Sequence, residues 1–152
     1  MTLLDAKEFD PEKDSRKRKR VILIVAVLLI LLGLGWWFRN WREEHIVRTF
    51  FAALEKQDFK TAYAIWQHDP NWAQHPDQYS KYPFNEFYQD WGPAGQWGTI
   101  KSARIHGSAN CPPPSSGILV DVVVNDRVEH AQVWVEKSDH TLSYPPCELI
   151  FH

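Results

Sequence analysis

A block of five cations directly before a long apolar run constrains this chain more than any other feature. The run extends without a charge from residue 21 to residue 38. As an α-helix its eighteen residues span roughly 27 Å, close to the hydrocarbon core of a bilayer at about 30 Å. We therefore predict a single transmembrane helix over residues 21–41. The cationic block consists of Arg16, Lys17, Arg18, Lys19 and Arg20.

The residues that follow the run favour a retained anchor. A cleaved secretory signal has an apolar region of about 7–15 residues and small residues at its cleavage site. Here Trp36 and Trp37 occupy that place, and Trp41 follows. Tryptophans are typical of the membrane–water interface. We expect a signal-anchor, and a cleaved signal peptide or a buried core helix are the alternatives.

The charge asymmetry around the run predicts its orientation. Cytoplasmic flanks carry an excess of Lys and Arg, so residues 1–20 are expected in the cytoplasm and residues 42–152 on the far side. The cationic block is also suited to contact with anionic lipid. Residues 1–20 are rich in charge and poor in apolar residues, which predicts a disordered tail. We expect a single-pass protein of the bacterial inner membrane with a periplasmic domain.

The charge of the exported part argues against nucleic acid as a partner. Residues 39–152 carry ten cations against fourteen anions. A phosphate-binding surface needs a basic patch, which this balance does not favour. The lipid bilayer, a protein partner or a second copy, and a small ligand are the partners we consider.

Helical patterns come first in the exported part. Apolar residues recur at helical spacing over residues 43–56, and Asp58 is a suitable N-cap for a second helix over residues 59–66. Residues 67–82 read as a loop. A third short helix is predicted for residues 83–91, before Gly92 and Pro93.

Strand patterns follow. Residues 100–106, 117–125, 128–137 and 141–151 are expected to be strands, the last one broken by Pro145 and Pro146. Short turns between them imply antiparallel hairpins. Helices followed by strands predict an α+β domain with about three helices packed on one face of a sheet.

The segment VRTFFAALEKQDFKTAYAIW, residues 47–66, resembles the opening of the nuclear transport factor 2-like (cystatin-like cone) superfamily. The shared features are the pairs Phe50-Phe51 and Ala53-Leu54, then Asp58, then Ala62-Tyr63. The resemblance implies a strongly curved antiparallel sheet wrapped around the first helix as a cone. It covers about residues 44–151 and points to small membrane-anchored bacterial members of unassigned function. It also implies dimerisation through the open sheet face.

Cys111 and Cys147 are the two cysteines of the chain. In an oxidising compartment such a pair is expected to form a disulfide. Two buried thiols or a pair of metal ligands are the alternatives. A redox-catalytic role is disfavoured because the chain has no CxxC spacing.

Asp121 and His130 are weak candidates for a catalytic pair. Alternation places each on the polar face of its strand, and the turn near residues 125–126 brings the two strands together. A carboxylate beside an imidazole is a possible acid–base pair. We favour the simpler interpretation, in which they form an exposed cross-strand ion pair.

His68 and His75 are weak candidates for metal ligands, in the segment HDPNWAQHPD that also holds two aspartates. The sequence contains no HExxH, GxSxG or glycine-rich phosphate loop, so solvated loop residues are the default interpretation. We expect no cofactor. We expect a binding or assembly module, an accessory or scaffold subunit of a membrane or envelope complex, rather than an enzyme. A small-ligand carrier, or an isomerase or dehydratase using the cone pocket, is the alternative.

Overall fold

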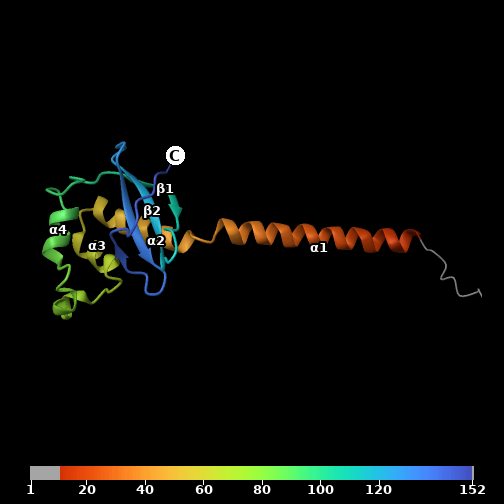
Figure 1. The fold of residues 1–152 in the computed structure, drawn as a ribbon, viewed down its shortest axis with the longest axis horizontal. Helices are drawn as coiled ribbons and strands as arrows, with labels where there is room; N and C mark the ends of the chain where they lie inside the picture. The colour runs from red at the N-terminus through yellow and green to blue at the C-terminus, as the bar shows by residue number, and fades with distance from the viewer. Residues whose placement is uncertain (1–10, 152) are drawn as a thin grey trace, which may run out of the picture. The chain divides into compact units, whose positions relative to one another are not determined.

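The computed structural model describes residues 11–151, with the side chains of residues 11–14 and 37 outside that description. The chain forms two compact units, one ending at Arg39 and the other beginning at Asn40 (Figure 1). The first is a single helix. The second is an α+β domain of helices followed by a four-stranded antiparallel sheet.

Helix α1 (Pro11–Trp37) contains residues 21–37 of the apolar run, and its large apolar side chains from Val21 to Leu34 are exposed. In the described part of the chain it is the one helix long and apolar enough to cross a bilayer. The helix begins ten residues before the predicted span. The structure thus includes residues 11–20 in this helix, where the sequence predicts a disordered tail, and residues 1–10 lie outside the described residues. Extending an existing helix is far easier than nucleating one, and Pro11 suits a first helical position.

The C-terminal end of the predicted transmembrane span, at residue 41, also differs from the end of the helix in the structure. Helix α1 ends at Trp37, residues 38–40 form a turn, and Trp41 opens the next helix. Gly33, Gly35 and Asn40 disfavour a continuous helix here, because glycine and asparagine have low helix propensity.

Three helices begin the folded domain. They are α2 (Trp41–Glu55), α3 (Phe59–Trp66) and α4 (Phe84–Trp91). Asp58 caps α3 as predicted, since its Oδ1 accepts a hydrogen bond from the backbone N–H of Thr61 at 3.1 Å. The loop before α4 contains two short 3₁₀ helices, Trp72–Gln74 and Pro76–Tyr79.

The sheet has the strand order β1-β2-β3-β4, with neighbouring strands antiparallel. Its strands are β1 (Ala103–Ala109), β2 (Gly117–Val124), β3 (His130–Glu136) and β4 (Leu142–Ser143). The last strand is far shorter than the predicted 141–151. After Ser143 the chain leaves the sheet, because Pro145 and Pro146 cannot donate ladder hydrogen bonds.

The turn between β2 and β3 uses two residues with positive φ, Asn125 at 51° and Asp126 at 54°. The backbone N–H of Arg127 donates to the carbonyl of Val124 at 3.0 Å. This is the geometry of a type I′ turn, whose twist suits antiparallel strands. The Asn125 side chain also accepts from the backbone N–H of Lys101 at 2.7 Å and donates to the carbonyl of Thr99 at 3.0 Å, which fixes the chain before β1.

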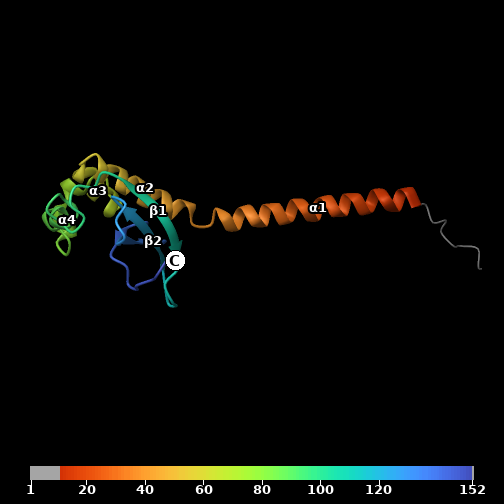
Figure 2. The same cartoon turned by 90° about the horizontal axis from the view of Figure 1, so that it is seen from above.

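The main core lies between the helices and one face of the sheet, and the sheet lies beside α2 (Figure 2). Aromatic rings fill this space. Phe50 is fully buried and packs against Trp66, Phe87 and Trp91 at centroid distances of 5.2–6.1 Å. The side chains of β2 at Ile118, Val120, Val122 and Val124 complete the core from the sheet side.

Candidate functional site

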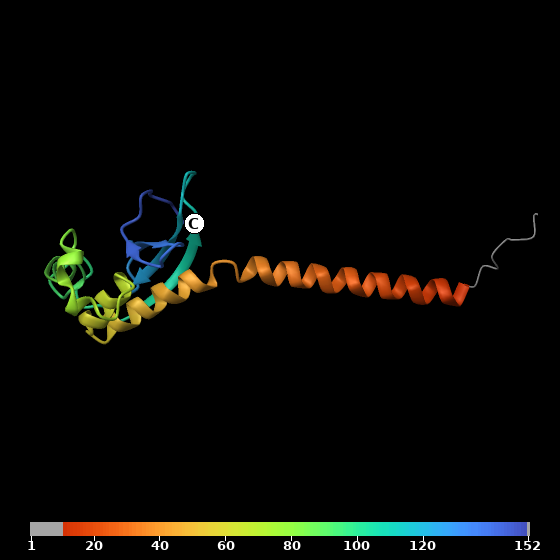
Figure 3. The same cartoon turned by 90° about the horizontal axis from the view of Figure 1, so that it is seen from below.

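The opposite face of the sheet carries a second, smaller cluster. It is formed by Leu119 of β2, Trp134 of β3 and Cys111, with parts of the C-terminal segment packed on it. The C-terminal segment and the helices lie on different sides of the sheet (Figure 3). Both faces of β2 are therefore covered, and all eight of its residues are buried.

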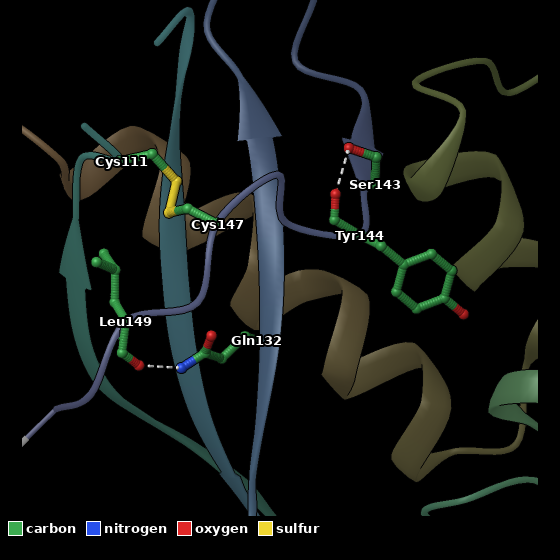
Figure 4. Close-up of a disulfide and its surroundings, with 6 residues drawn as sticks. All are labelled: Cys111, Gln132, Ser143, Tyr144, Cys147 and Leu149. Atoms are coloured by element: carbon green, nitrogen blue, oxygen red, sulfur yellow. Dashed lines mark hydrogen bonds between the residues drawn. A yellow bond between two sulfur atoms is a disulfide. The ribbon is translucent and has the colours of Figure 1, made fainter. Parts of the chain in front are cut away.

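The predicted disulfide between Cys111 and Cys147 is present and joins the loop after β1 to the C-terminal segment (Figure 4). The two Cα atoms are 6.0 Å apart, within the range that a disulfide requires. The bond ties the segment after Pro146 across the strands. It thereby brings Leu149 and Phe151 onto the second cluster.

Asp121 is the charged residue at the centre of this face. Alternation along β2 directs Leu119, Asp121 and Val123 away from the main core, and Asp121 is 1% exposed. The interpretation of Asp121 as a solvent-exposed partner is therefore wrong. The C-terminal segment covers Asp121. The alternation of residues along β2 gives no sign of this contact, because the segment is distant in sequence.

Two histidines from the neighbouring strands reach the same oxygen of Asp121. The Nδ1 atom of His130 on β3 lies 2.6 Å from Asp121 Oδ2, and the Nδ1 atom of His106 on β1 lies 3.0 Å from it. The two imidazole centroids are 5.0 Å apart. The pair that the sequence suggested, Asp121 and His130, thus becomes a group of three in the structure.

A β-bulge aims His106 at this group. Ile105 pairs with Val122 and Gly107 pairs with Asp121, so His106 is an extra residue in β1. A bulge redirects side chains locally, and such features often occur beside functional sites. Simple alternation over residues 100–106 does not reveal the bulge, which is why sequence reasoning missed His106. A histidine next to a strand glycine was the available signal.

Gln132 holds the other carboxylate oxygen. Its Nε2 donates to Asp121 Oδ1 at 3.3 Å and to the carbonyl of Leu149 at 2.7 Å; Figure 4 shows the second of these bonds. Gln132 therefore links the buried carboxylate to the C-terminal segment.

This arrangement supports two kinds of chemistry. A carboxylate accepts hydrogen bonds, so each histidine presents Nδ1–H to Asp121 and keeps the lone pair of Nε2 for another group. The side chains of His106 and His130 are 33% and 25% exposed, so both rings can be reached from solvent. Such imidazoles can act as bases. The group can also hold a metal ion, because one donor atom from each of His106, Asp121 and His130 lies within 4.8 Å of the others.

A cleft of about 450 Å³ opens beside this group. His130 and Gln132 line one part of it, and Trp91, Trp97 and Tyr144 line another. A small-molecule site in a protein has about this size and this mixture of aromatic and polar walls.

A tyrosine pair stands near the same cleft. The hydroxyls of Tyr82 and Tyr144 each donate to Asp90 Oδ2 at 2.8 Å. Burial raises the pKa of Tyr144 to about 12, and burial with the hydrogen bonds to Tyr144 and Asp90 raises the pKa of Tyr82 above its ordinary value. These phenols are therefore neutral hydrogen-bond donors at physiological pH.

The predicted metal candidates His68 and His75 lie in separate environments. His75 Nε2 is 2.5 Å from Asp69 Oδ2, an oxygen that also accepts from the Tyr79 hydroxyl at 2.7 Å. The Tyr79 bond lowers the pKa of Asp69. The ring of His68 lies 5.7 Å from that of His140. The structure brings neither histidine into the group around Asp121.

The residues predicted to anchor the chain lie on helices. Trp36 is 74% exposed on α1, and Trp41 is 59% exposed on α2, where it stacks on His45. The side chain of Trp37 lies outside the described residues. The cationic block falls within α1 and is exposed.

No family model, curated protein sequence or solved structure matches this chain significantly. The resemblance to the nuclear transport factor 2-like superfamily therefore stays a prediction.

Proposed function

We propose that the protein is a membrane-anchored binding module whose folded domain, from Asn40 onward, works outside the cytoplasm as an accessory or scaffold subunit of a membrane or envelope complex. The observation that carries this proposal is a disulfide-bonded domain on the same chain as an exposed apolar helix. Disulfides persist in extracytoplasmic compartments and are rare in the cytosol. An apolar helix whose described large apolar side chains are exposed suits a lipid environment.

The charge pattern supports the orientation. Residues 16–20 are all cationic, whereas the side of the run facing the domain has only Arg39 and Arg42 before Glu43. The positive-inside rule then favours a cytoplasmic N-terminus. In this arrangement the disulfide between Cys111 and Cys147 forms after export.

A groove on the helical side of the domain supports a binding role. It has a volume of about 380 Å³ and lies between α2 and α3, with Ile46, Ala64 and Ile65 among its walls. Apolar grooves between helices accept apolar side chains of a partner protein.

A topology experiment tests the proposal. A tag after His152 should be digested by protease added to intact spheroplasts, while a tag before Met1 should be digested only after lysis. The reverse pattern, or a C-terminal tag protected until lysis, would refute the extracytoplasmic assignment. Native-size analysis after gentle detergent extraction should then show a complex larger than one chain. A solitary monomer would contradict the role as a subunit.

A small-ligand carrier or an enzyme is the second candidate function, and the cleft beside Asp121 favours it. Its aromatic wall at Trp97 and Tyr144 would contact an apolar ligand, and His130 would orient a polar group. Native mass spectrometry of the detergent-extracted protein tests this candidate. A bound small molecule should be lost in L149W, whose indole would fill part of the cleft. A molecule retained by that variant would lie elsewhere and contradict the assignment.

A further inference from the structure

We propose that His106, Asp121 and His130 form a binding site for one divalent transition-metal ion of the Zn²⁺ class. The three residues come from three adjacent strands, β1, β2 and β3. One donor atom from each lies within 4.8 Å of the other two. The inference concerns the domain alone and does not depend on the topology or partners proposed above.

The donor types select the ion. Two imidazole nitrogens with one carboxylate oxygen are a known ligand set for zinc, and imidazole also suits other late first-row transition ions. Mg²⁺ and Ca²⁺ prefer sites made of oxygen alone, so the group does not suit them. Two histidines and a carboxylate without a cysteine also argue against a structural Cys-rich zinc site.

The distances are close to those of a bound ion. Zinc lies about 2.0–2.2 Å from nitrogen and carboxylate oxygen, so two ligand atoms of a tetrahedral site are roughly 3.4 Å apart. The Nδ1 atoms of His130 and His106 lie 2.6 and 3.0 Å from Asp121 Oδ2. Each of these two pairs of atoms would have to separate by roughly 0.4–0.8 Å to reach that spacing. Binding at the two Nδ1 atoms requires each neutral imidazole to carry its proton on Nε2 instead, an exchange of tautomers through solvent that leaves the rings neutral.

The surroundings of the group are buried and hydrogen-bonded. Asp121 is 1% exposed on the central part of a strand that is buried along its whole length. Gln132 donates to Asp121 Oδ1, which leaves Oδ2 for the ion. Outer-shell hydrogen bonds of this kind orient metal ligands and usually affect affinity by about 10–100-fold.

Three protein ligands leave one coordination position open. The exposed parts of His106 and His130 place that position toward solvent, and His130 also lines the 450 Å³ cleft. Structural zinc sites have four protein ligands, whereas sites with three keep a place for water or a ligand. The site is therefore of the open type, with a water molecule or a ligand of the cleft as the fourth partner.

The test is calorimetric titration of Zn²⁺ into the full chain, purified in detergent and freed of metal with a chelator. We expect one ion per chain, and at least a tenfold loss of affinity in H106A and in H130A. D121N keeps the size of the side chain but removes its charge and replaces one accepting oxygen by a donating NH2 group, so it should lose binding without a change in volume. Q132A should lower affinity by about 10–100-fold without abolishing binding. The matched controls are H68A and H75A, which should bind as the unaltered protein does.

A second readout uses Co²⁺ in place of Zn²⁺. A four-coordinate site gives visible absorption bands, which should be present in the unaltered protein and absent in H130A. Near-ultraviolet circular dichroism shows whether each variant is folded, and H106Q replaces H106A if the latter is not. Failure of the unaltered protein to bind either ion at micromolar concentration would overturn the proposal, as would undiminished binding in H106A and H130A. Neither result bears on the topology experiment, so the two proposals fail separately.

Discussion

The indole of Trp134 lies across β2 at Gly117, where a larger residue has no room. A Cβ atom at Gly117 would clash with the backbone carbonyl oxygen of Val135. It would also lie only 2.6 Å from an indole carbon of Trp134. A Cβ atom at Gly107 would have more room, because the nearest atom it would meet is in the ring of Phe151, at 3.1 Å. A backbone carbonyl cannot move aside, whereas a side chain near the end of the described chain can.

We predict that G117A lowers the free energy of unfolding by about 1–3 kcal/mol, as overpacking of a core does. G107A should cost less than about 1 kcal/mol because Phe151 can shift. Urea denaturation of both variants, followed by tryptophan fluorescence, measures the difference. Equal losses would show that the indole of Trp134 does not lie over Gly117.

The raised pKa of Tyr144 predicts how the stability of the domain changes at alkaline pH. Its pKa is raised to about 12, mainly by burial, against an ordinary value of about 10. A raised pKa stabilises the folded state while the phenol is neutral, so this contribution is complete below pH about 10 and is lost as pH rises toward 12. In the native protein, we expect the tyrosinate absorbance of Tyr144 to appear only near pH 12. In Y144F, stability should fall less steeply over that interval. An equally steep fall in Y144F would contradict the assignment.

At the residue scale, half of the candidate site could be predicted. Alternation and the turn at residues 125–126 placed Asp121 and His130 on one face, and the structure puts them 2.6 Å apart. His106 was missed because the bulge after Ile105 breaks the two-residue period. The burial of Asp121 was missed because it depends on a segment distant in sequence. The disulfide was the one signal for that contact, since it ties residue 147 to the loop after β1.

At the scale of elements, the local signals worked where they agreed with one another. Apolar spacing, the Asp58 cap and a break at Gly92 predicted α2, α3 and α4 to within two residues. β2 and β3 followed from β-branched residues and turn signals. The last strand failed because its apolar residues, such as Leu149, pack on the outer face of the sheet without joining its ladder.

The turn between β2 and β3 provides an element-scale prediction. Asn125 has φ 51°, which glycine adopts freely and alanine does not. Both N125A and N125G lose the side-chain bonds to Lys101 and Thr99, so they form a matched pair. N125A should be less stable than N125G by about 1 kcal/mol, measured by thermal unfolding. Equal stability would mean that the turn does not need a positive φ at this position.

The disulfide provides a second element-scale prediction. Replacing both cysteines, as C111A/C147A, should lower the free energy of unfolding by about 3–4 kcal/mol, because a loop of 36 residues is no longer closed in the unfolded chain. The unaltered protein under reducing conditions should lose a similar amount. Hydrogen exchange should also rise at Leu149, which the bond holds against the sheet. Unchanged stability in the double variant would contradict this account of the C-terminal segment.

At the scale of the whole molecule, the apolar helix and the folded domain both support the proposal of a membrane-anchored protein with an extracytoplasmic domain. The helix exposes its apolar side chains, and the domain contains a bond that oxidising compartments favour. The α+β class followed from the order of elements, whereas the filling of the space beneath the sheet by Phe50, Trp66 and Phe87 did not. Packing of that kind depends on how three helices meet, which no local pattern specifies.

The intact mass of the protein isolated from membranes, with and without alkylation of free thiols, tests this interpretation most directly. A retained anchor in an extracytoplasmic protein predicts a chain that still contains α1 and whose Cys111 and Cys147 react only after reduction. A mature chain beginning beyond Trp37, or two thiols that react without reduction, would contradict it.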